Sequence, residues 1–283
     1  MHNAKILLAL TLIFTVLVSF QSTSDSIKVS QLMQQMFTEI SKISTIKYTF
    51  KNTERINGKF LSGEIQVTYN TKPKKIYILM QKPTQGVEIL FQDGINNNSA
   101  IYSPNGFPFI KLYLDPYGDM MRKNNHHTIH EAGMAYMAKI LKQTYTKYPS
   151  NFKYVGDVIW EGKNCHKIEI DILTYKIVSY TMKEKETIKS ISKALNISDF
   201  KILELNNDID EYNYSQTGKS IKIPSCYAKK MELYIDSETF LPVFQKIYDE
   251  KGLFEQYEYL NIEVNKKLNE NVFLESNLGL IND

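Results

Sequence analysis

Residues 180–224, YTMKEKETIKSISKALNISDFKILELNNDIDEYNYSQTGKSIKIP, decide how the chain is organised. Apolar residues recur every three or four positions in two runs, which predicts two short amphipathic helices. Gly218 then permits a turn, and alternating isoleucines indicate a half-buried strand that ends at Pro224. The apolar positions of the helices are Ile188, Ile191 and Leu195, followed by Ile202, Leu203 and Leu205. The predicted order is strand, helix, helix, strand.

Three features of this stretch occur together: the Tyr180-Thr181 opening, the Glu186-Thr187 helix entry, and the Gly-Lys-x-Ile-x-Ile-Pro close. On these features the stretch resembles the LysM family. The resemblance implies two antiparallel strands with both helices on one side. It also implies binding of N-acetylglucosamine-containing glycans such as peptidoglycan or chitin. A generic pair of amphipathic helices within a longer domain is the simpler alternative.

The same resemblance implies a shallow sugar groove between the two loops that flank the helices. Backbone groups there would meet the N-acetyl group, while apolar side chains such as Ile209 would cover the ring. The candidate glycan-binding residues are Lys183, Glu184, Lys185, Glu186, Thr187, Asn206, Asn207, Asp208 and Ile209. The family usually has glycine where this chain has Lys185, so a module that folds without binding sugar is also an open alternative.

The N-terminal residues predict export. A positively charged start is followed by an apolar run over residues 6–20 and a polar exit, as in a secretory signal peptide over residues 1–22. The run is shorter than the ~20 residues that cross a bilayer, so a cleaved signal is favoured over an uncleaved anchor. We therefore expect an exported, periplasmic protein that is soluble or N-terminally anchored.

Composition is that of an ordinary folded protein. The chain has 43% hydrophobic and 12% aromatic residues and only 8 prolines, so it can bury a sizeable core. Its net charge of +3 is spread over many residues of both signs. This distribution predicts no nucleic-acid partner.

Outside the LysM-like stretch, alternation of polar and apolar residues predicts antiparallel strands with one dry face. The clearest runs are residues 63–70, 167–171, 230–236 and 254–264. In the last run the alternation places Leu260, Ile262 and Val264 on one face, with Tyr257 and Tyr259 on the other. Helical spacing marks residues 29–43 and 133–145.

These elements predict an α+β fold, in which helices close a curved antiparallel sheet. The sheet body would consist of two sequence pieces, residues 26–178 and 226–283. The βααβ LysM-like module at residues 179–225 would be inserted between them.

The body itself resembles the domain-of-unknown-function family 1571. The matching residues are Lys74, the run 85–91, the run 105–108, the run 114–122, the run 127–133, and the runs 234–236, 241–242 and 249–255. More distantly, the pattern is similar to the periplasmic lipoprotein-carrier fold, a half-barrel around an apolar cavity. That resemblance implies a lipid or lipoprotein acyl chain as a possible partner.

In such a half-barrel, a group of methionines would form an adaptable cavity lining. The candidates are Met80, Met120, Met121, Met134 and Met137. Methionines at helical spacing more often fill a core between sheet and helices, and we favour that interpretation.

The histidines suggest a metal site that we do not predict. His126 and His130 would share one side of a helical turn, with His127 and Glu131 beside them, as metal ligands require. The glutamate follows the second histidine, however, whereas the zinc-protease pattern needs it directly after the first. We therefore interpret these residues as a helix entrance and expect no metal or other cofactor.

Other catalytic signals are weak. No nucleophile elbow, phosphate loop or dinucleotide fingerprint is present. Cys165 and His166 are neighbours on a predicted strand, where consecutive side chains point to opposite faces. Strand geometry also separates Cys165 from Cys226 by roughly 40 Å, too far for a disulfide.

Together these features predict a non-catalytic cell-envelope protein. The LysM-like module would contact peptidoglycan or a related glycan, and the body would act as a carrier or sensor. Two alternatives stay open: a wall or lipid hydrolase positioned by the module, and a structural scaffold whose module does not bind.

Overall fold

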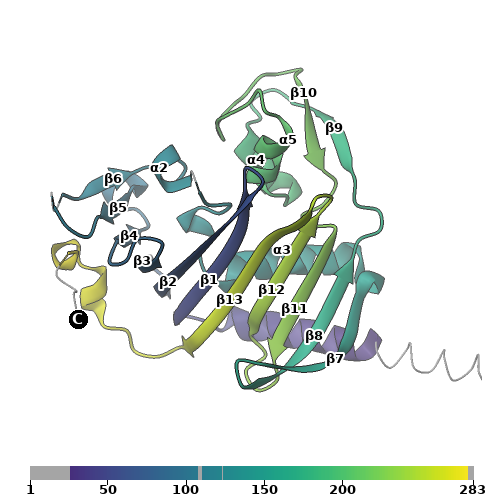
Figure 1. Ribbon diagram of the computed structural model, residues 1–283, viewed down its shortest axis with the longest axis horizontal. Helices are drawn as coiled ribbons and strands as arrows, with labels where there is room; N and C mark the ends of the chain where they lie inside the picture. The colour runs from purple at the N-terminus through teal and green to yellow at the C-terminus, as the bar shows by residue number, and fades with distance from the viewer. Residues whose placement is uncertain (1–25, 108–109, 123, 280–283) are drawn as a thin grey trace, which may run out of the picture.

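A computed structural model describes residues 26–107, 110–122 and 124–279. The predicted signal peptide at residues 1–22 lies outside these residues. Figure 1 shows one large sheet with helices on a single face and a small module beyond one end of the strands. Within the described ranges, no helix is both long and apolar enough to cross a membrane.

The sheet is antiparallel throughout and has two free edges, in the order β6-β5-β4-β3-β2-β1-β13-β12-β11-β8-β7. Its strands are β1 (Thr45–Ile56), β2 (Lys59–Thr71), β3 (Lys74–Lys82), β4 (Glu88–Gln92), β5 (Ala100–Ser103), β6 (Leu112–Leu114), β7 (Phe152–Trp160), β8 (Lys163–Asp171), β11 (Lys230–Asp236), β12 (Pro242–Asp249) and β13 (Gly252–Val264). The predicted strands at residues 63–70, 167–171, 230–236 and 254–264 all lie within these elements.

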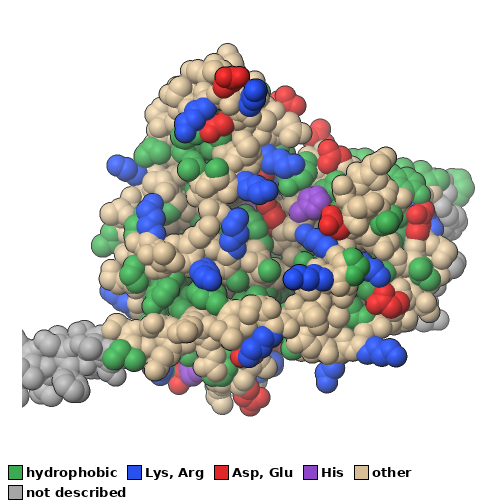
Figure 2. Space-filling model, turned by 180° about the vertical axis from the view of Figure 1, so that it is seen from behind, with side chains coloured by type: hydrophobic (Ala, Val, Ile, Leu, Met, Phe, Trp, Pro, Cys, Tyr) green, Lys and Arg blue, Asp and Glu red, His purple; other side chains and the backbone are tan. Residues whose placement is uncertain are grey.

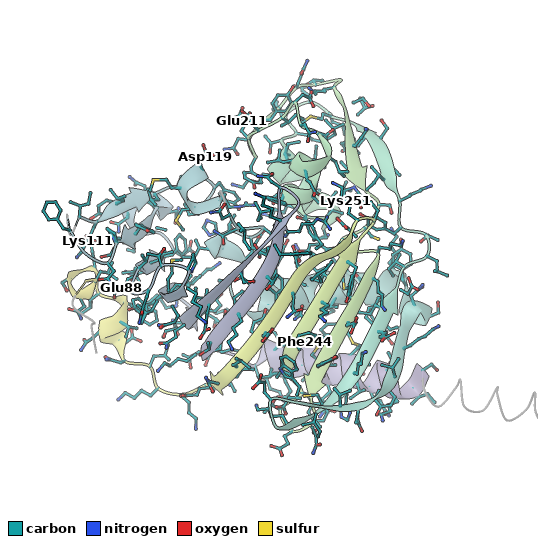
Figure 3. All side chains as sticks on the ribbon, in the orientation of Figure 1. Glu88, Lys111, Asp119, Glu211, Phe244 and Lys251 are labelled. Atoms are coloured by element: carbon teal, nitrogen blue, oxygen red, sulfur yellow. The ribbon has the colours of Figure 1, made fainter. Side chains whose placement is uncertain are left out.

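Two helices cover one face of the sheet, namely the N-terminal helix at residues 26–41 and α3 (Met134–Lys147). Both carry the apolar stripes that their sequences predicted, with Met36 and Ile140 fully buried. The opposite face of the sheet carries Phe244, which is outside the main core and stacks on Tyr234 at 4.6 Å. Figure 3 labels it on the lower part of the sheet. The predicted α+β fold, a curved antiparallel sheet covered by helices, is confirmed.

One predicted strand face was wrong. Tyr257 and Tyr259 lie in the main core, and Ile262 and Val264 pack against the same core. A bulge opposite Lys47 and Thr49 shifts the register, and Asn261 takes a left-handed conformation there with φ of 52°. The extra residue turns the second half of the strand over, so both sets of side chains reach one face.

The 180–224 stretch folds as β9 (Ile177–Thr181), α4 (Ile188–Leu195), α5 (Asp199–Leu205) and β10 (Ser220–Pro224). This is the predicted order. The two strands pair only with each other, from Ile177 with Pro224 to Thr181 with Ser220. We call residues 177–224 the module. A core separate from that of the sheet fills it, consisting of Met182, Ile188, Ile191, Ile197, Ile202, Ile209, Ile221 and Ile223.

Local hydrogen bonds explain where the module helices begin. The Thr187 hydroxyl accepts from the Ser190 N–H at 3.1 Å, and the Ser198 hydroxyl accepts from the Lys201 N–H at 3.2 Å. The module leaves and rejoins the sheet between β8 and β11, which are hydrogen-bonded neighbours. Because Ile177 and Pro224 lie side by side, the excursion leaves that pairing intact.

Candidate ligand cavity

A cavity of about 570 Å³ lies between the inner face of β1–β3 and the segment 120–137. It opens to the face that carries the helices. Figure 2 shows that apolar, basic and acidic side chains are interspersed on this face.

Most of the cavity wall is apolar. Its apolar side chains come from the sheet, from α2 (Asp119–Arg122), from residues 129–132 and from α3. They include Phe50, Leu61, Ile65, Val67, Ile78, Met80, Ile89, Met120, Met121, Ile129, Ala132 and Met137. Four of the five candidate methionines therefore border the cavity. The fifth, Met134, is buried in the main core.

One end of the cavity is polar. Glu54 from β1 contributes there, with His127, Glu131 and Tyr136 from the opposite wall and Tyr257 from β13. The Tyr257 hydroxyl donates to Glu54 Oε1 at 2.8 Å, and Glu54 Oε2 accepts from the backbone N–H of His126 at 2.8 Å. Both oxygens of Glu54 are therefore occupied by protein donors.

His127 lies between two carboxylates. Its Nδ1 is 3.1 Å from Glu131 Oε2, and its Nε2 is 3.5 Å from Glu255 Oε1 and 3.3 Å from the Tyr227 hydroxyl. Burial lowers the pKa of His127, but the charge of Glu255 and the hydrogen bond to Glu131 outweigh it and hold the pKa well above its usual range. The two carboxylates therefore favour the protonated, cationic form of the ring.

The two carboxylates respond in the opposite direction. Burial raises the pKa of Glu255, but the charge of His127 and the hydrogen bond to His126 lower it to about 2. Burial likewise raises the pKa of Glu131, and the hydrogen bond and charge of His127 bring it below its usual value. The polar end thus holds ionised carboxylates on both sides of His127.

The other histidines do not converge on a metal position. Residues 126–128 are not helical, and only Ile129–Glu131 form a short 3-10 turn, so the expected helical alignment of His126 and His130 is absent. The His126 ring stacks between Phe200 and Phe254 at 4.1 and 4.2 Å, while His130 packs against Phe91. Across the described residues, no group of three or more His, Cys, Asp or Glu side chains has metal-ligand geometry.

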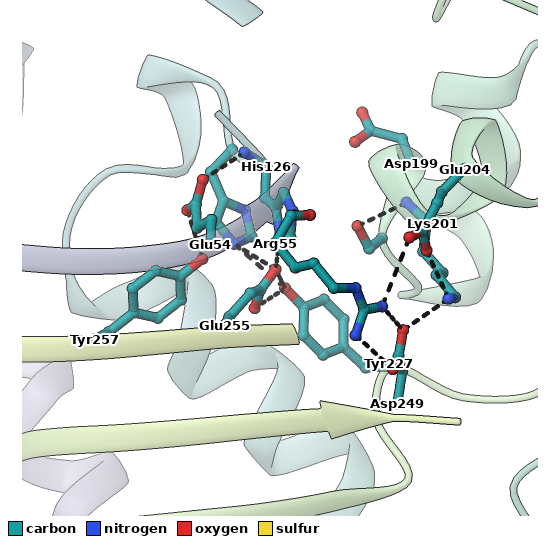
Figure 4. A network of polar contacts seen from close by, with 12 residues as sticks. Glu54, Arg55, His126, Asp199, Lys201, Glu204, Tyr227, Asp249, Glu255 and Tyr257 are labelled. Atoms are coloured by element: carbon teal, nitrogen blue, oxygen red, sulfur yellow. Dashed lines mark hydrogen bonds and ion pairs between the residues drawn. The ribbon is translucent and has the colours of Figure 1, made fainter. Parts of the chain in front are cut away.

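A buried ionic lattice joins the module to the sheet (Figure 4). Lys201 on α5 donates to Asp249, Glu204 and Glu250, at 2.7 Å each, and its side chain is 1% exposed. Arg55 on β1 pairs with both oxygens of Asp249. Figure 3 places Lys251 in the β12–β13 turn beside the module, where its Nζ lies 3.2 Å from Glu204.

A second buried ion pair lies directly behind the cavity wall. Arg122 in α2 donates to the two Asp199 oxygens at 2.8 and 3.3 Å, and to the His126 carbonyl at 2.9 Å. Its guanidinium also lies 3.9 Å from the Tyr212 ring. Since Met121 on the same short helix borders the cavity, α2 contacts the ligand space on one side and the module on the other.

Seven of the nine candidate glycan residues are exposed or half-buried. Lys183, Glu184 and Lys185 are exposed in the loop before α4, and Asn207 and Asp208 are exposed after α5. Glu186 and Thr187 are half-buried and used locally, because Glu186 accepts from the Lys183 N–H and Thr187 caps α4. Lys185 has φ of 63°, the left-handed region in which the LysM family usually has glycine.

Two of the nine serve the module's own structure. Ile209 is 3% exposed and lies in the module core, so it does not present a surface to a sugar ring as predicted. Asn206 is buried, and its amide group bonds the Ile202 carbonyl and both backbone groups of Lys222. Asn206 thus links the end of α5 to β10 by hydrogen bonds.

No sequence pattern predicted the buried ionic lattice. Lys201 occupies a helical run where a lysine predicts a solvated side chain, and its partner Asp249 lies 48 residues away. Arg122 and Asp199 are similarly distant, 77 residues apart. The only local signal was the crowding of charges at Asp249-Glu250-Lys251, which sequence alone cannot assign to a partner.

Residues 43–188 match the family described as "Protein of unknown function (DUF1571)". The chain belongs to this family. The match begins just before β1 and ends at the first residue of α4, so it covers β1–β9 and all of the cavity lining except Tyr257 and Tyr259. No curated protein matches this DUF1571 protein.

Several solved structures are similar to it at low identity. The Pseudomonas aeruginosa MucA/MucB complex matches at 13% identity and a TM-score of 0.42, covering 87% of this chain and 60% of that chain. The Mycobacterium tuberculosis lipoprotein LppX matches at 11% identity and 0.41, covering 86% and 97%. A putative outer membrane lipoprotein-sorting protein domain from Vibrio parahaemolyticus matches at 9% and 0.36, covering 91% and 99%.

Proposed function

We propose that this DUF1571 protein is a non-catalytic carrier of the cell envelope that holds the apolar chain of an amphiphile, such as a lipid or lipoprotein acyl chain. The observation that carries the proposal is the cavity between β1–β3 and the segment 120–137. Its volume of about 570 Å³ is in the range of small-molecule sites. The apolar run at residues 6–20 supports export to the envelope.

The make-up of the wall suits a flexible chain. Four methionines border the space, and their unbranched, polarizable side chains adapt to irregular partners. A predominantly apolar wall with a few polar groups at one end is the usual form of a ligand site. His127 contacts two carboxylates and a tyrosine hydroxyl, which favours binding over nucleophilic catalysis.

Fluorescence of N-phenyl-1-naphthylamine, a neutral apolar probe, tests the cavity directly. We expect saturable uptake by the wild-type protein and at least tenfold weaker uptake by Ala132→Trp, because Ala132 borders the cavity and the larger ring would fill it. Leu173→Trp is the matched control, since Leu173 is 84% exposed and does not border the cavity. Equal uptake by both variants, or none by the wild type, would overturn the proposal. Release of a hydrolysed product from a lipid would favour the hydrolase alternative.

A second function is supported by the module. We propose that its exposed loops, at residues 183–185 and 207–208, contact peptidoglycan or another N-acetylglucosamine glycan. The supporting observation is that backbone N–H groups at the start of α4 bond the segment after α5, with Lys189 N–H to the Tyr212 carbonyl at 3.0 Å. The two loops of the implied groove therefore lie side by side.

Co-sedimentation with insoluble peptidoglycan tests this contact. Glu184→Trp and Asn207→Trp place bulk in the two loops and should reduce the sedimented fraction at least fivefold, whereas Lys193→Trp on exposed α4 should not. These variants are preferable to removing the module, because its loss would take Asp199 from the buried Arg122 and Lys201 from the buried Asp249. Sedimentation that is absent in the wild type would leave the module a structural scaffold.

A further inference from the structure

The polar end of the cavity has a chemistry that constrains what binds there. Resting on the proposed carrier function, we propose that this end selects the head group of the ligand. It accepts a neutral or cationic head that donates hydrogen bonds, such as a hydroxyl or an amine, and it rejects carboxylate and phosphate. The groups that make this selection are Glu131 and Glu54, which border the cavity, together with His127 and the buried Glu255 that it contacts.

Among the described residues that border this end, His127 is the one cation, and both of its ring nitrogens already face protein groups. Its Nδ1 bonds Glu131 at 3.1 Å, and its Nε2 faces Glu255 at 3.5 Å and Tyr227 at 3.3 Å. A charge held between two carboxylates is already compensated. An anionic ligand would have to displace one of them at a buried position, where unpaired charge is costly.

Glu131 supplies the acceptor. Its Oε2 is taken by His127 and by the Thr128 N–H at 3.1 Å, whereas Oε1 accepts no hydrogen bond from the described residues. The Glu131 side chain is 20% exposed and borders the cavity. A ligand hydroxyl or ammonium can therefore donate to this oxygen. A carboxylate or phosphate there would meet like charge instead.

The remaining cations near the cavity do not offset this. Arg122 is directed at Asp199, on the far side of the wall from the ligand space. Lys82 borders the cavity, but its side chain is 73% exposed and lies 3.7 Å from Glu64. Water and salt screen such an exposed charge. Lys74 also lies near Glu131, but it does not border the cavity, and its ammonium donates to the His130 carbonyl at 2.7 Å. Among the described residues that border the polar end, the carboxylates Glu54 and Glu131 thus outnumber the one cation, His127.

A series of probes with one chain length and different heads tests the inference. Dodecanol, dodecylamine, methyl dodecanoate and dodecanoate would each compete with N-phenyl-1-naphthylamine at pH 7, below their aggregation limits. We expect dodecanol and dodecylamine to compete at concentrations at least tenfold lower than dodecanoate. Methyl dodecanoate, a neutral head without a donor, should fall between them.

Glu131→Gln assigns the effect to the proposed group. It removes the charge while keeping the shape, so the preference against dodecanoate should shrink to less than threefold. Glu64→Gln is the matched control, because this half-buried carboxylate does not border the cavity, and it should leave the preference unchanged. Circular dichroism would confirm that both variants are folded, and the wild-type ranking stands as a test by itself if Glu131→Gln is not.

The outcomes separate this inference from the function on which it rests. Dodecanoate that competes as well as dodecanol would overturn the head-group selection while leaving the carrier function intact. An unchanged preference in folded Glu131→Gln would also overturn it. Failure of every twelve-carbon probe, together with no uptake of the fluorescent probe, would overturn the carrier function itself.

Discussion

The two sides of α2 have opposite character. On one side lies the cavity, where Met120 and Met121 meet apolar side chains of the sheet across about 570 Å³ of space. On the other lies the contact with the module, where Arg122 meets Asp199 and is 2% exposed. One four-residue helix therefore separates an open apolar space from a closed ionic contact.

The difference follows from what each kind of group tolerates. Buried charges must be paired at hydrogen-bonding distance, so at the module contact Lys201 and Arg55 each lie directly against a carboxylate. Apolar side chains that border a void lose only part of their dispersion contacts. A ligand space is therefore tolerable on the sheet side of α2 and not on the module side.

The strongest test of this comparison is to remove a charge from the lattice. Lys201→Ala leaves Asp249, Glu204 and Glu250 without their shared cation, and we expect it to lower the free energy of unfolding by about 3–5 kcal/mol. Urea denaturation at pH 7 measures the change. Lys193→Ala, on the exposed side of the module's first helix, should change it by less than about 0.5 kcal/mol.

A loss for Lys201→Ala no larger than that of Lys193→Ala would show that the lattice is solvated. The contrast between the two sides of α2 would then fail.

Acid should lower the stability of the protein by protonating Glu255. The pKa of Glu255 is lowered from 4.5 to about 2, so its stabilising contribution is complete above pH 4.5 and is lost as the pH falls toward 2. The shift corresponds to about 3 kcal/mol. Urea unfolding between pH 6 and 2 should show this loss, and Glu255→Gln should flatten the curve, whereas the exposed Glu263→Gln should not.

The ion pair between His127 and Glu255 also makes stability depend on pH on the alkaline side. Its pKa is raised, so its contribution is complete below about pH 6.5 and is lost as the pH rises through the folded value. The two effects describe one interaction and do not add. A free energy of unfolding that increases as the pH falls from 4.5 to 2 would contradict the pairing of His127 with Glu255.

The sequence predicted much of the fold because its apolar patterns are local. Alternation found the four strand runs, and three-to-four spacing found both covering helices and both module helices. The alternation assigned Tyr257 and Tyr259 to the wrong face, because one bulged residue at Asn261 reverses it. A pattern with a fixed period cannot register a single inserted residue.

The candidate sites were less predictable for a different reason. Pattern alone could not place Met80, Met120, Met121 and Met137 around one cavity. Met80 lies 40 to 57 positions before the other three in the sequence, and only the packing of the folded chain brings them together. Glu255 and Lys201 were missed because charged residues are normally exposed, and burial depends on partners distant in sequence. Ile209 was assigned to a ligand although its spacing also fits the module core.

Truncating one methionine that borders the cavity and one in the packed core sharpens the comparison. Met80 borders the cavity, whereas Met36 is completely buried in the main core. We expect Met80→Ala to lower the free energy of unfolding by about 1 kcal/mol and Met36→Ala by about 2–5 kcal/mol, since Met36 loses contacts on all sides. Thermal and urea denaturation compare the two. Equal losses would indicate that the cavity collapses around Met80 in solution.

The smallest effect concerns the module loop that lies away from both sides of α2. Lys185 holds φ of 63°, which strains an L-residue, so Lys185→Gly should stabilise the protein by about 0.5–1 kcal/mol. Lys193→Gly makes the same chemical change inside α4, where glycine costs about 1 kcal/mol, and should have the opposite sign. Because the lattice and the cavity are untouched, probe uptake should not change in either variant. Destabilisation by Lys185→Gly would mean that residue 185 does not adopt the left-handed conformation in solution.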